Sequence, residues 1–257
     1  MPTLQFTGRI HPDVGQISVT NVPTVNWTDE EIGLEMAFSF QIEKSAVRVE
    51  CRVNRFTPDD IVPIWMRAFD LVRAAVDLTC FSTGIGATVI LDILIDPSGA
   101  RSTLLADSRK LLSGICTAFS LGGAPGGDFS TVLNIVLKEP ALFMAMNDLV
   151  TAITLPHHSP VTCARAVERL RNIITLGVSG KGKGWESLRH NLQIDKEYLE
   201  FITGKSTGPR HGDPARVSGN ITTEMVRRAW IIMNRFLEFR KRGNKPLAST
   251  EFPMLTS

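Results

Sequence analysis

The hydrophobic pattern of this chain changes its period from the N-terminal to the C-terminal part, and this change restricts the folds that the chain can form. Apolar and polar side chains alternate along residues 1–55, as in strands with one buried face. Along residues 160–242 apolar side chains recur at every third or fourth position, as in amphipathic helices. We therefore predict an α+β fold, with an antiparallel β-sheet and a packed helix in residues 1–125 and an all-α helical bundle in residues 126–257.

Five strands are expected in the N-terminal part, each bounded by turn residues. They are residues 4–10, 15–20, 33–43, 46–54 and 88–95. His11-Pro12-Asp13 separates the first two strands and Glu43-Lys44-Ser45 the next two, so two antiparallel hairpins are predicted. The fifth segment, TVILDILI, is β-branched and apolar like a buried strand, and a turn at Asp96-Pro97-Ser98-Gly99 ends it.

One long helix is expected after the fourth strand. Thr57 is its predicted N-cap, because Pro58 suits the first helical turn and Asp60 completes a Thr-x-x-Asp capping pattern. The helix is expected to end near Thr79. Its apolar face is predicted to pack on the sheet and consists of Ile61, Ile64, Trp65, Ala68, Phe69, Val72 and Val76.

A glycine-rich segment at residues 121–128, after a predicted helix at 106–119, is the expected domain boundary. A helix interrupted or restarted at Pro140 should follow it. Further helices are expected at residues 160–177, 184–193, 195–204 and 221–242. The last one has two adjacent apolar rows and should lie in the bundle core: Met225, Ala229, Ile232, Phe236 and Phe239, then Val226, Trp230, Met233 and Leu237. Residues 245–257 are predicted to form a tail.

Charge is divided unevenly along the chain. Residues 1–159 hold 11 lysines and arginines against 17 aspartates and glutamates, a net charge of −6, whereas residues 160–257 hold 17 against 9, a net charge of +8. A basic helical part can attract phosphate groups over a screening length of roughly 10 Å. It can equally dock against the acidic part of its own chain, so the charge alone leaves both interpretations open.

Several functional classes have no support in the sequence. The start MPTLQFTGRI has no secretory signal and no run reaches the roughly 18 to 20 apolar residues of a membrane span, so we expect a cytoplasmic protein with no membrane partner. The cysteines form no Cys-x-x-Cys pair, which predicts reduced thiols. No Gly-x-Ser-x-Gly, His-Glu-x-x-His or complete phosphate-loop motif occurs, and we expect no cofactor and no metal.

The polar segment KSTGPRHGD, residues 205–213, lies between two predicted helices of the basic part. ARAVERLRN at 164–172 and WESLR at 185–189 precede it, and the long last helix follows. In this arrangement the helical part resembles the HEPN superfamily of small helical domains, and within it the abortive-infection and Apea-like branches. The resemblance implies a motif of an arginine followed, after four to six residues, by a histidine. Active members are metal-independent endoribonucleases that work as dimers.

The motif residues can be assigned one by one under this resemblance. His211 matches the histidine, and Gly212 matches the glycine that often follows it. Lys205 occupies the position of the arginine, and a lysine keeps the charge but lacks the planar fork that binds phosphate at two points. Arg210 is a second cation beside the histidine. In an active site His211 would transfer protons, and Arg210 or Lys205 would stabilise charge on the phosphate oxygens.

The residues leave two functional interpretations of the helical part. Lys205 in place of arginine favours a non-catalytic or degenerate HEPN-like module of a bacterial stress or phage-defence protein, which would bind a partner or RNA as a homodimer. The alternative is an active endoribonuclease with His211, Arg210 and Lys205 at a dimer cleft. A purely structural role would pair Arg210 with Glu168 or Glu200 and bond His211 to the backbone.

A third hypothesis places an enzyme site in the front part of the chain, at residues 83–96. Its only support is a pair of glycines, Gly84 and Gly86, that lead into a predicted strand. Glycines at such positions usually serve a turn or a bulge. The ligand of the β-rich part stays unassigned.

Overall fold

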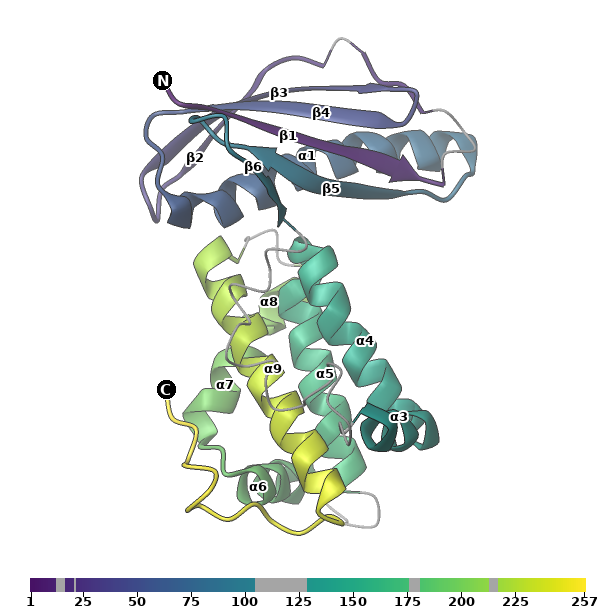
Figure 1. The fold of residues 1–257 in the computed structure, drawn as a ribbon, viewed down its shortest axis with the longest axis vertical. Helices are drawn as coiled ribbons and strands as arrows, with labels where there is room; N and C mark the ends of the chain where they lie inside the picture. Colours follow the sequence, from purple (N-terminus) through teal and green to yellow (C-terminus); the bar gives the residue numbers. More distant parts are fainter. Residues whose placement is uncertain (13–16, 21, 105–128, 176–180, 213–216) are drawn as a thin grey trace. The chain divides into compact units, whose positions relative to one another are not determined.

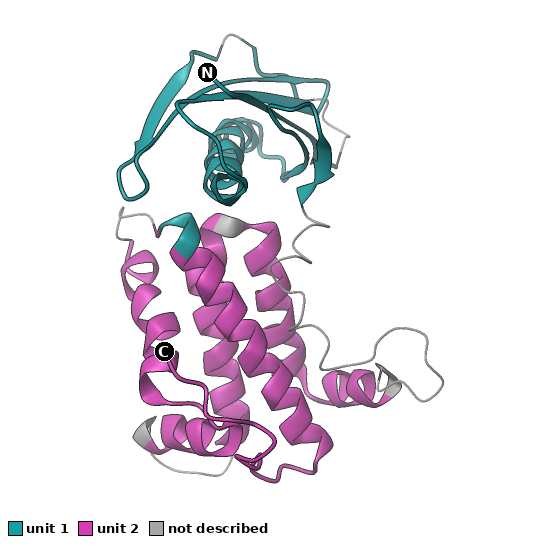
Figure 2. Cartoon of the chain, turned by 60° about the vertical axis from the view of Figure 1, so that its left-hand side comes forward, with its two compact units in different colours: residues 1–108, 218–220 teal, residues 109–217, 221–257 magenta. Residues whose placement is uncertain are grey.

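The computed structural model describes residues 1–12, 17–20, 22–104, 129–175, 181–212 and 217–257 (Figure 1). The chain divides into two compact units, residues 1–108 with 218–220 and residues 109–217 with 221–257 (Figure 2). The first unit contains the sheet and the second contains the helices of the C-terminal part, so the predicted α+β class is confirmed. The predicted helix at 106–119 and the boundary segment at 121–128, including the division at residue 125, lie outside the described residues.

The described residues of the first unit form a six-stranded antiparallel sheet. Its strands are β1 Thr3–His11, β2 Val25–Asp29, β3 Leu34–Glu43, β4 Ala46–Val53, β5 Thr88–Ile95 and β6 Arg101–Thr103. They lie in the order β2-β3-β4-β1-β5-β6. The predicted hairpin around Glu43-Lys44-Ser45 and the predicted strand at 88–95 are confirmed. The turn after β5 is also confirmed, because Asp96 Oδ1 accepts hydrogen bonds from the backbone of Ser98 and Ala100.

The prediction of a strand at 15–20, paired with the first strand in a hairpin, is wrong. Residues 13–16 lie outside the described part, and Val19 makes only a single bridge, with Ile42 of β3. Strand β1 pairs instead with β4 on one side and β5 on the other. Alternation predicts that a segment is extended, but it does not select the partner strand. The long apolar strand β5 pairs with β1 along Gln5–His11, where the segment at 15–20 was expected. Strands β2 and β6 were not predicted.

Helix α1, Ile61–Thr83, covers one face of the sheet (Figure 2). A short 3-10 turn, Pro58–Asp60, leads into it, and Asp60 Oδ2 accepts hydrogen bonds of 2.8 Å from both the backbone N–H and the hydroxyl of Thr57. The predicted apolar face is buried except for Ile61, which is half-buried. Gly84 ends the helix with a φ of +71°. Gly84 therefore serves a helix end, which is a structural role for the first glycine of the pair at 84 and 86.

The opposite face of the sheet is polar and contains a depression of about 580 Å³. Its side chains come from β1, β3 and β4, and include Gln5, Thr7, Gln41, Arg48 and Glu50. Cross-strand neighbours in this row include Glu50 opposite Gln5 and Arg48 opposite Thr7. Hydrogen-bonding groups of both charges line the depression, so it has no marked preference for one sign of ligand.

The second unit is helical. Its described helices are α3 Phe129–Lys138, α4 Pro140–Thr154, α5 Ser159–Ile174, α6 Lys181–Leu192, α7 Lys196–Lys205, α8 Thr207–Arg210 and α9 Gly219–Lys241, with a 3-10 turn at Pro156–His158. Helices were predicted at each of these places except α8. The two predicted rows of α9 are buried, apart from the half-buried Trp230, and they join residues of α4 and α5 in one apolar core.

The C-terminal segment is not a free tail as predicted. Leu247 is buried, and its N–H donates to Asn191 O at 2.9 Å. The N–H of Leu255 donates to Gln193 O at 2.9 Å. Arg235 of α9 completes the attachment by donating to the carbonyl oxygens of Gln193 and Pro253 at 2.8 and 2.7 Å. An arginine that satisfies several carbonyls can order a segment whose own composition indicates no structure.

Within the described part of the chain, no helix has the length and apolar character needed to cross a membrane.

Candidate functional site

The three residues predicted as a site lie at the ends of two short helices. Lys205 is the last residue of α7, Arg210 is the last residue of α8, and His211 follows directly. Helix α8 is a single turn that packs against α5 and α7. The N–H of His211 donates to Gly208 O at 2.9 Å, and Gly212 then turns the chain with a φ of +80°. The local turn therefore determines where Arg210 and His211 are presented.

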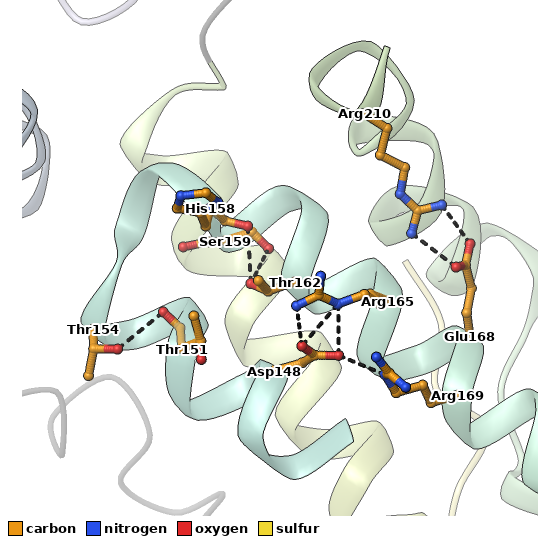
Figure 3. A network of polar contacts seen from close by, with 10 residues as sticks. All are labelled: Asp148, Thr151, Thr154, His158, Ser159, Thr162, Arg165, Glu168, Arg169 and Arg210. Atoms are coloured by element: carbon orange, nitrogen blue, oxygen red, sulfur yellow. Dashed lines mark hydrogen bonds and ion pairs between the residues drawn. The ribbon is translucent and has the colours of Figure 1, made fainter. Parts of the chain in front are cut away.

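Arg210 is engaged by a carboxylate of α5. Its Nη1 and Nη2 donate to Oε1 and Oε2 of Glu168 at 2.7 and 3.0 Å (Figure 3). The two side chains are 29% and 31% exposed. A planar guanidinium and a carboxylate that meet through two parallel hydrogen bonds satisfy each other's charge and geometry. A phosphate group could use both of these nitrogens only by displacing Glu168.

This contact matches the structural role considered for Arg210. Of the two expected partners, Glu168 is the one that binds it, while Glu200 pairs with Lys196 at 3.2 Å. His211 and Lys205 are exposed. Within the described residues, the imidazole of His211 makes no hydrogen bond and the ammonium of Lys205 makes no ion pair. The structure therefore does not connect Lys205, Arg210 and His211 through hydrogen bonds or ion pairs.

A second polar cluster, which sequence reasoning missed, lies between α4 and α5. Asp148 of α4 has a side chain only 7% exposed. Its Oδ1 and Oδ2 accept from Nε of Arg165 at 3.0 Å each, Oδ1 also accepts from Nη2 of Arg165, and Oδ2 accepts from Nε of Arg169 at 3.0 Å (Figure 3). We call Asp148, Arg165 and Arg169 the Asp148 cluster. The sequence signal that could have indicated it was a carboxylate in α4, a helix with no other charged residue.

The Asp148 cluster holds two cations on one carboxylate. The hydrogen bonds that Arg165 donates to Asp148 raise the pKa of this arginine above its usual value. Cys163, buried beside the cluster, has its pKa raised to about 12 by burial and by the negative charge of Asp148. One guanidinium suffices to neutralise Asp148, so the cluster as a whole carries a surplus positive charge.

Hydroxyl groups fix the connection that brings α5 alongside α4. Ser159 Oγ donates to Ala152 O at 2.6 Å, and Thr162 Oγ1 donates to His158 O at 3.0 Å. Both hydroxyls belong to residues that are buried. These bonds satisfy backbone carbonyls at the end of α4 and the start of α5, and so hold the face of α5 that carries Arg165 and Arg169.

Most other arginines of this unit stabilise the fold. Arg228 lies over the rings of Tyr198 and Phe201 and donates to Glu224, and Arg242 binds Glu238 and Glu251. Arg171 stacks on Trp185. These contacts hold the arginines in place but do not cancel the net charge of +8 counted for residues 160–257, because that figure already sets every acid against a base. The Asp148 cluster differs from the contact of Glu224 with Arg227 and Arg228 in the burial of its acid, since Asp148 is 7% exposed and Glu224 is 35% exposed.

Within the described residues, no group of three or more histidine, cysteine, aspartate or glutamate side chains could hold a metal ion. Cys51, Cys80 and Cys163 are free thiols; Cys116 lies outside the described part. Burial raises the pKa of Cys51 to about 12. The thiol groups of Cys51 and Cys163 are therefore protonated near neutral pH and are poor nucleophiles.

The fold and these contacts define a two-unit α+β protein with an arginine–carboxylate surface on its helical unit. Residues 4–105 match the N-terminal domain of DUF8168, a domain of unknown function, and residues 129–241 match the C-terminal domain of DUF8168. The two matches follow each other in order and together cover most of the chain, so the chain belongs to the DUF8168 family. No curated protein and no solved structure matches it.

Proposed function

We propose that this protein is a non-catalytic, HEPN-like module of the kind found in bacterial stress and phage-defence proteins, and that its basic helical unit binds RNA without cutting it. The observation that carries the proposal is the two-point contact of Arg210 with Glu168. It occupies the guanidinium that stands beside His211. With Lys205 in the place of the motif arginine, the described motif residues 205–212 offer no free planar cation to the scissile phosphate.

Proton transfer is also poorly arranged at this position. Acid–base catalysis needs a histidine whose orientation is held by a partner. His211 is exposed and its ring has no hydrogen bond within the described residues. Lys205 is an exposed point charge at the end of α7. These residues can add to the attraction of a phosphate backbone, but their arrangement gives little of the stabilisation that cleavage requires.

The proposed module associates as a homodimer through α3 and α4. Five apolar side chains of these helices are 41% to 67% exposed: Leu133, Leu137, Phe143, Met144 and Val150. None of them carries a charge, so two copies related by a two-fold axis can meet there without like-charge repulsion. Sedimentation of Leu137→Glu should show loss of the dimer. Leu78→Glu, at a 69% exposed leucine of the first unit, is the control, and a monomeric wild type would contradict this part of the proposal.

The decisive experiment measures RNA binding and RNA cleavage on the same samples. Fluorescence anisotropy of a labelled single-stranded RNA should show binding that weakens steeply with salt. Incubation of a mixed RNA pool in EDTA should leave the RNA intact, both for the wild type and for His211→Ala and Arg210→Ala. Circular dichroism of each variant checks that it is folded.

Two results would overturn the proposal. Cleavage by the wild type that both variants lose would establish the alternative, a metal-independent endoribonuclease that uses His211 and Arg210. Failure to bind any RNA at low salt would exclude the RNA-binding module altogether. Cleavage that survives both substitutions would identify a contaminating nuclease and would require a further purification step before either result counts.

A further inference from the structure

The Asp148 cluster leaves more guanidinium N–H groups than its carboxylate accepts. Arg165 directs Nε and Nη2 at Asp148, and Arg169 directs only Nε. Within the described part of the chain, Nη1 of Arg165 and both terminal nitrogens of Arg169 make no hydrogen bond. The terminal nitrogens of Arg169 are not among the buried polar atoms without a partner, and the side chain of Arg165 is 47% exposed. Both guanidinium groups are therefore accessible to a ligand.

Burial makes the two sides of the cluster unequal. The side chain of Asp148 is 7% exposed, whereas those of Arg165 and Arg169 are 47% and 30% exposed. The negative charge is thus inside the unit and the positive charges face outward. Two arginines one turn apart on a helix repel each other, and the buried carboxylate compensates only one of them. An anion on the outer side would remove the remaining repulsion.

The cluster is also held in place before any ligand arrives. Asp148 binds both Nε atoms, which restricts the rotamers of the two arginines while their outer nitrogens stay exposed (Figure 3). A receptor whose groups are already ordered loses less conformational entropy on binding. The neighbouring pair of Glu168 and Arg210 differs, because each partner there satisfies the other.

We infer that Arg165 and Arg169, oriented by Asp148, form a binding site for a phosphate group on α5. A phosphate oxygen would accept hydrogen bonds from the terminal nitrogens of Arg169, and a second oxygen from Nη1 of Arg165. The identity of the natural ligand, a phosphodiester of RNA, rests on the proposed function. The site itself requires only phosphate chemistry, so it can be tested separately.

The test titrates inorganic pyrophosphate into the full-length protein at low ionic strength and follows binding by calorimetry. Arg169→Gln and Arg165→Gln should each weaken binding roughly tenfold, the loss expected for a charge-assisted hydrogen bond. Arg227→Gln is the matched control, because the Arg227 side chain is also 47% exposed and also shares its carboxylate, Glu224, with a second arginine, but Glu224 is 35% exposed and lies 3.7 Å from Arg227, so it does not hold Arg227 in place. It should bind pyrophosphate like the wild type. Arg169→Lys, which keeps the charge but not the fork, should recover only part of the affinity.

A measurement on the wild type alone guards against variants that do not fold. In nuclear magnetic resonance spectra of the arginine Nε–H groups, pyrophosphate should shift the signals of Arg165 and Arg169 and leave that of Arg227 in place. Equal shifts of all three signals, or no shift of the first two, would overturn the site. So would wild-type affinity in both glutamine variants.

Repeating the titration with single-stranded RNA separates this inference from the proposed function. Binding of pyrophosphate at the site without binding of RNA would support the site and exclude the RNA-binding function. Binding of RNA that neither glutamine variant weakens would support the function and overturn RNA as the ligand of this site. If both hold, Arg169→Gln should lower the slope of log affinity against log salt by about 0.7, the value for one phosphate contact on a single strand.

Discussion

Two arginine–carboxylate contacts that α5 makes with neighbouring helices have opposite consequences. At Glu168 one carboxylate meets one guanidinium, and both side chains are about equally exposed. At Asp148 one buried carboxylate meets two arginines whose outer nitrogens remain open to solvent. Both contacts join a carboxylate to guanidinium groups, but the first is balanced in charge and the second carries a surplus positive charge. The ratio of partners and the burial of the acid therefore decide whether an arginine is available to a ligand.

The largest expected effect comes from removing the buried acid. Asp148→Asn should lower the free energy of unfolding by about 2–3 kcal/mol, because two arginines lose their shared counter-charge. The loss stays below that of a fully buried pair, since both arginines remain partly hydrated. Urea unfolding followed by circular dichroism measures it. Glu168→Gln is the matched variant and should lose no more than about 1 kcal/mol; equal losses would remove the distinction between the two contacts.

A third arginine, Arg228, is placed against an aromatic ring as well as a carboxylate and extends the comparison. Arg228 lies over the ring of Tyr198, which is the single tyrosine of the chain. Burial raises the pKa of Tyr198 to about 12, although the charge of Arg228 opposes this shift. The folded state thus keeps the proton longer than the unfolded state, whose tyrosine has a pKa of about 10. The stabilisation is complete below about pH 10 and is lost as the pH rises towards about 12.

Ultraviolet absorbance of the ionised phenol follows this titration directly, because no other tyrosine contributes. The folded protein should titrate near pH 12, and the protein in denaturant near pH 10. A folded-state midpoint at the ordinary value would mean that the Tyr198 hydroxyl is hydrated, against its burial in the structure.

A substitution at Glu168 can release the guanidinium of Arg210 from its ion pair. Glu168→Gln removes the counter-charge of Arg210 and should strengthen RNA binding about threefold, with a salt slope steeper by about 0.7. Glu200→Gln makes the same charge change at a residue that pairs with Lys196 and serves as the control. Anisotropy titrations over a range of salt give both values. An equal gain in both variants would show a general charge effect and not the release of Arg210.

The smallest expected effect concerns Cys163, which reports on the packing around Asp148. It is fully buried and its pKa is about 12, so an alkylating reagent should leave it unmodified while it labels the half-buried Cys80. In Asp148→Asn the rate of labelling at Cys163 should rise as local opening becomes easier. Peptide mapping by mass spectrometry measures both sites. An unchanged rate of labelling in that variant would mean that the local opening that exposes Cys163 does not depend on Asp148.

Local patterns predicted elements well and partners poorly. The segment at 88–95 forms a strand with the predicted bounds, and Thr57 and Asp60 form the predicted contact at the start of α1. The segment at 15–20 failed as a hairpin partner because the edge of β1 is taken by β5, which is distant in sequence. Periodicity depends on neighbouring residues, whereas pairing depends on competition among all strands of the sheet.

For the candidate site, too, the sequence predicted the local segment but not the partners of its side chains. The segment with Arg210 and His211 could be located from sequence, because it is a polar break between helices. Its pairing with Glu168 was one of two open alternatives, since the sequence does not specify which acid a long side chain reaches. The Asp148 cluster was missed because its three residues come from two helices, and each has an ordinary explanation when it is considered alone.

The sequence by itself determined the α+β class, most helices and strands of the described part, and the apolar faces of α1 and α9, because these follow from the spacing of side chains along the chain. The tertiary structure alone decided the strand order, the attachment of the C-terminal segment, and which arginines are neutralised. The physical reason is that a charge is neutralised by whatever lies within a few ångströms in space, and burial sets how strongly that contact counts. Neither quantity is encoded in sequence spacing.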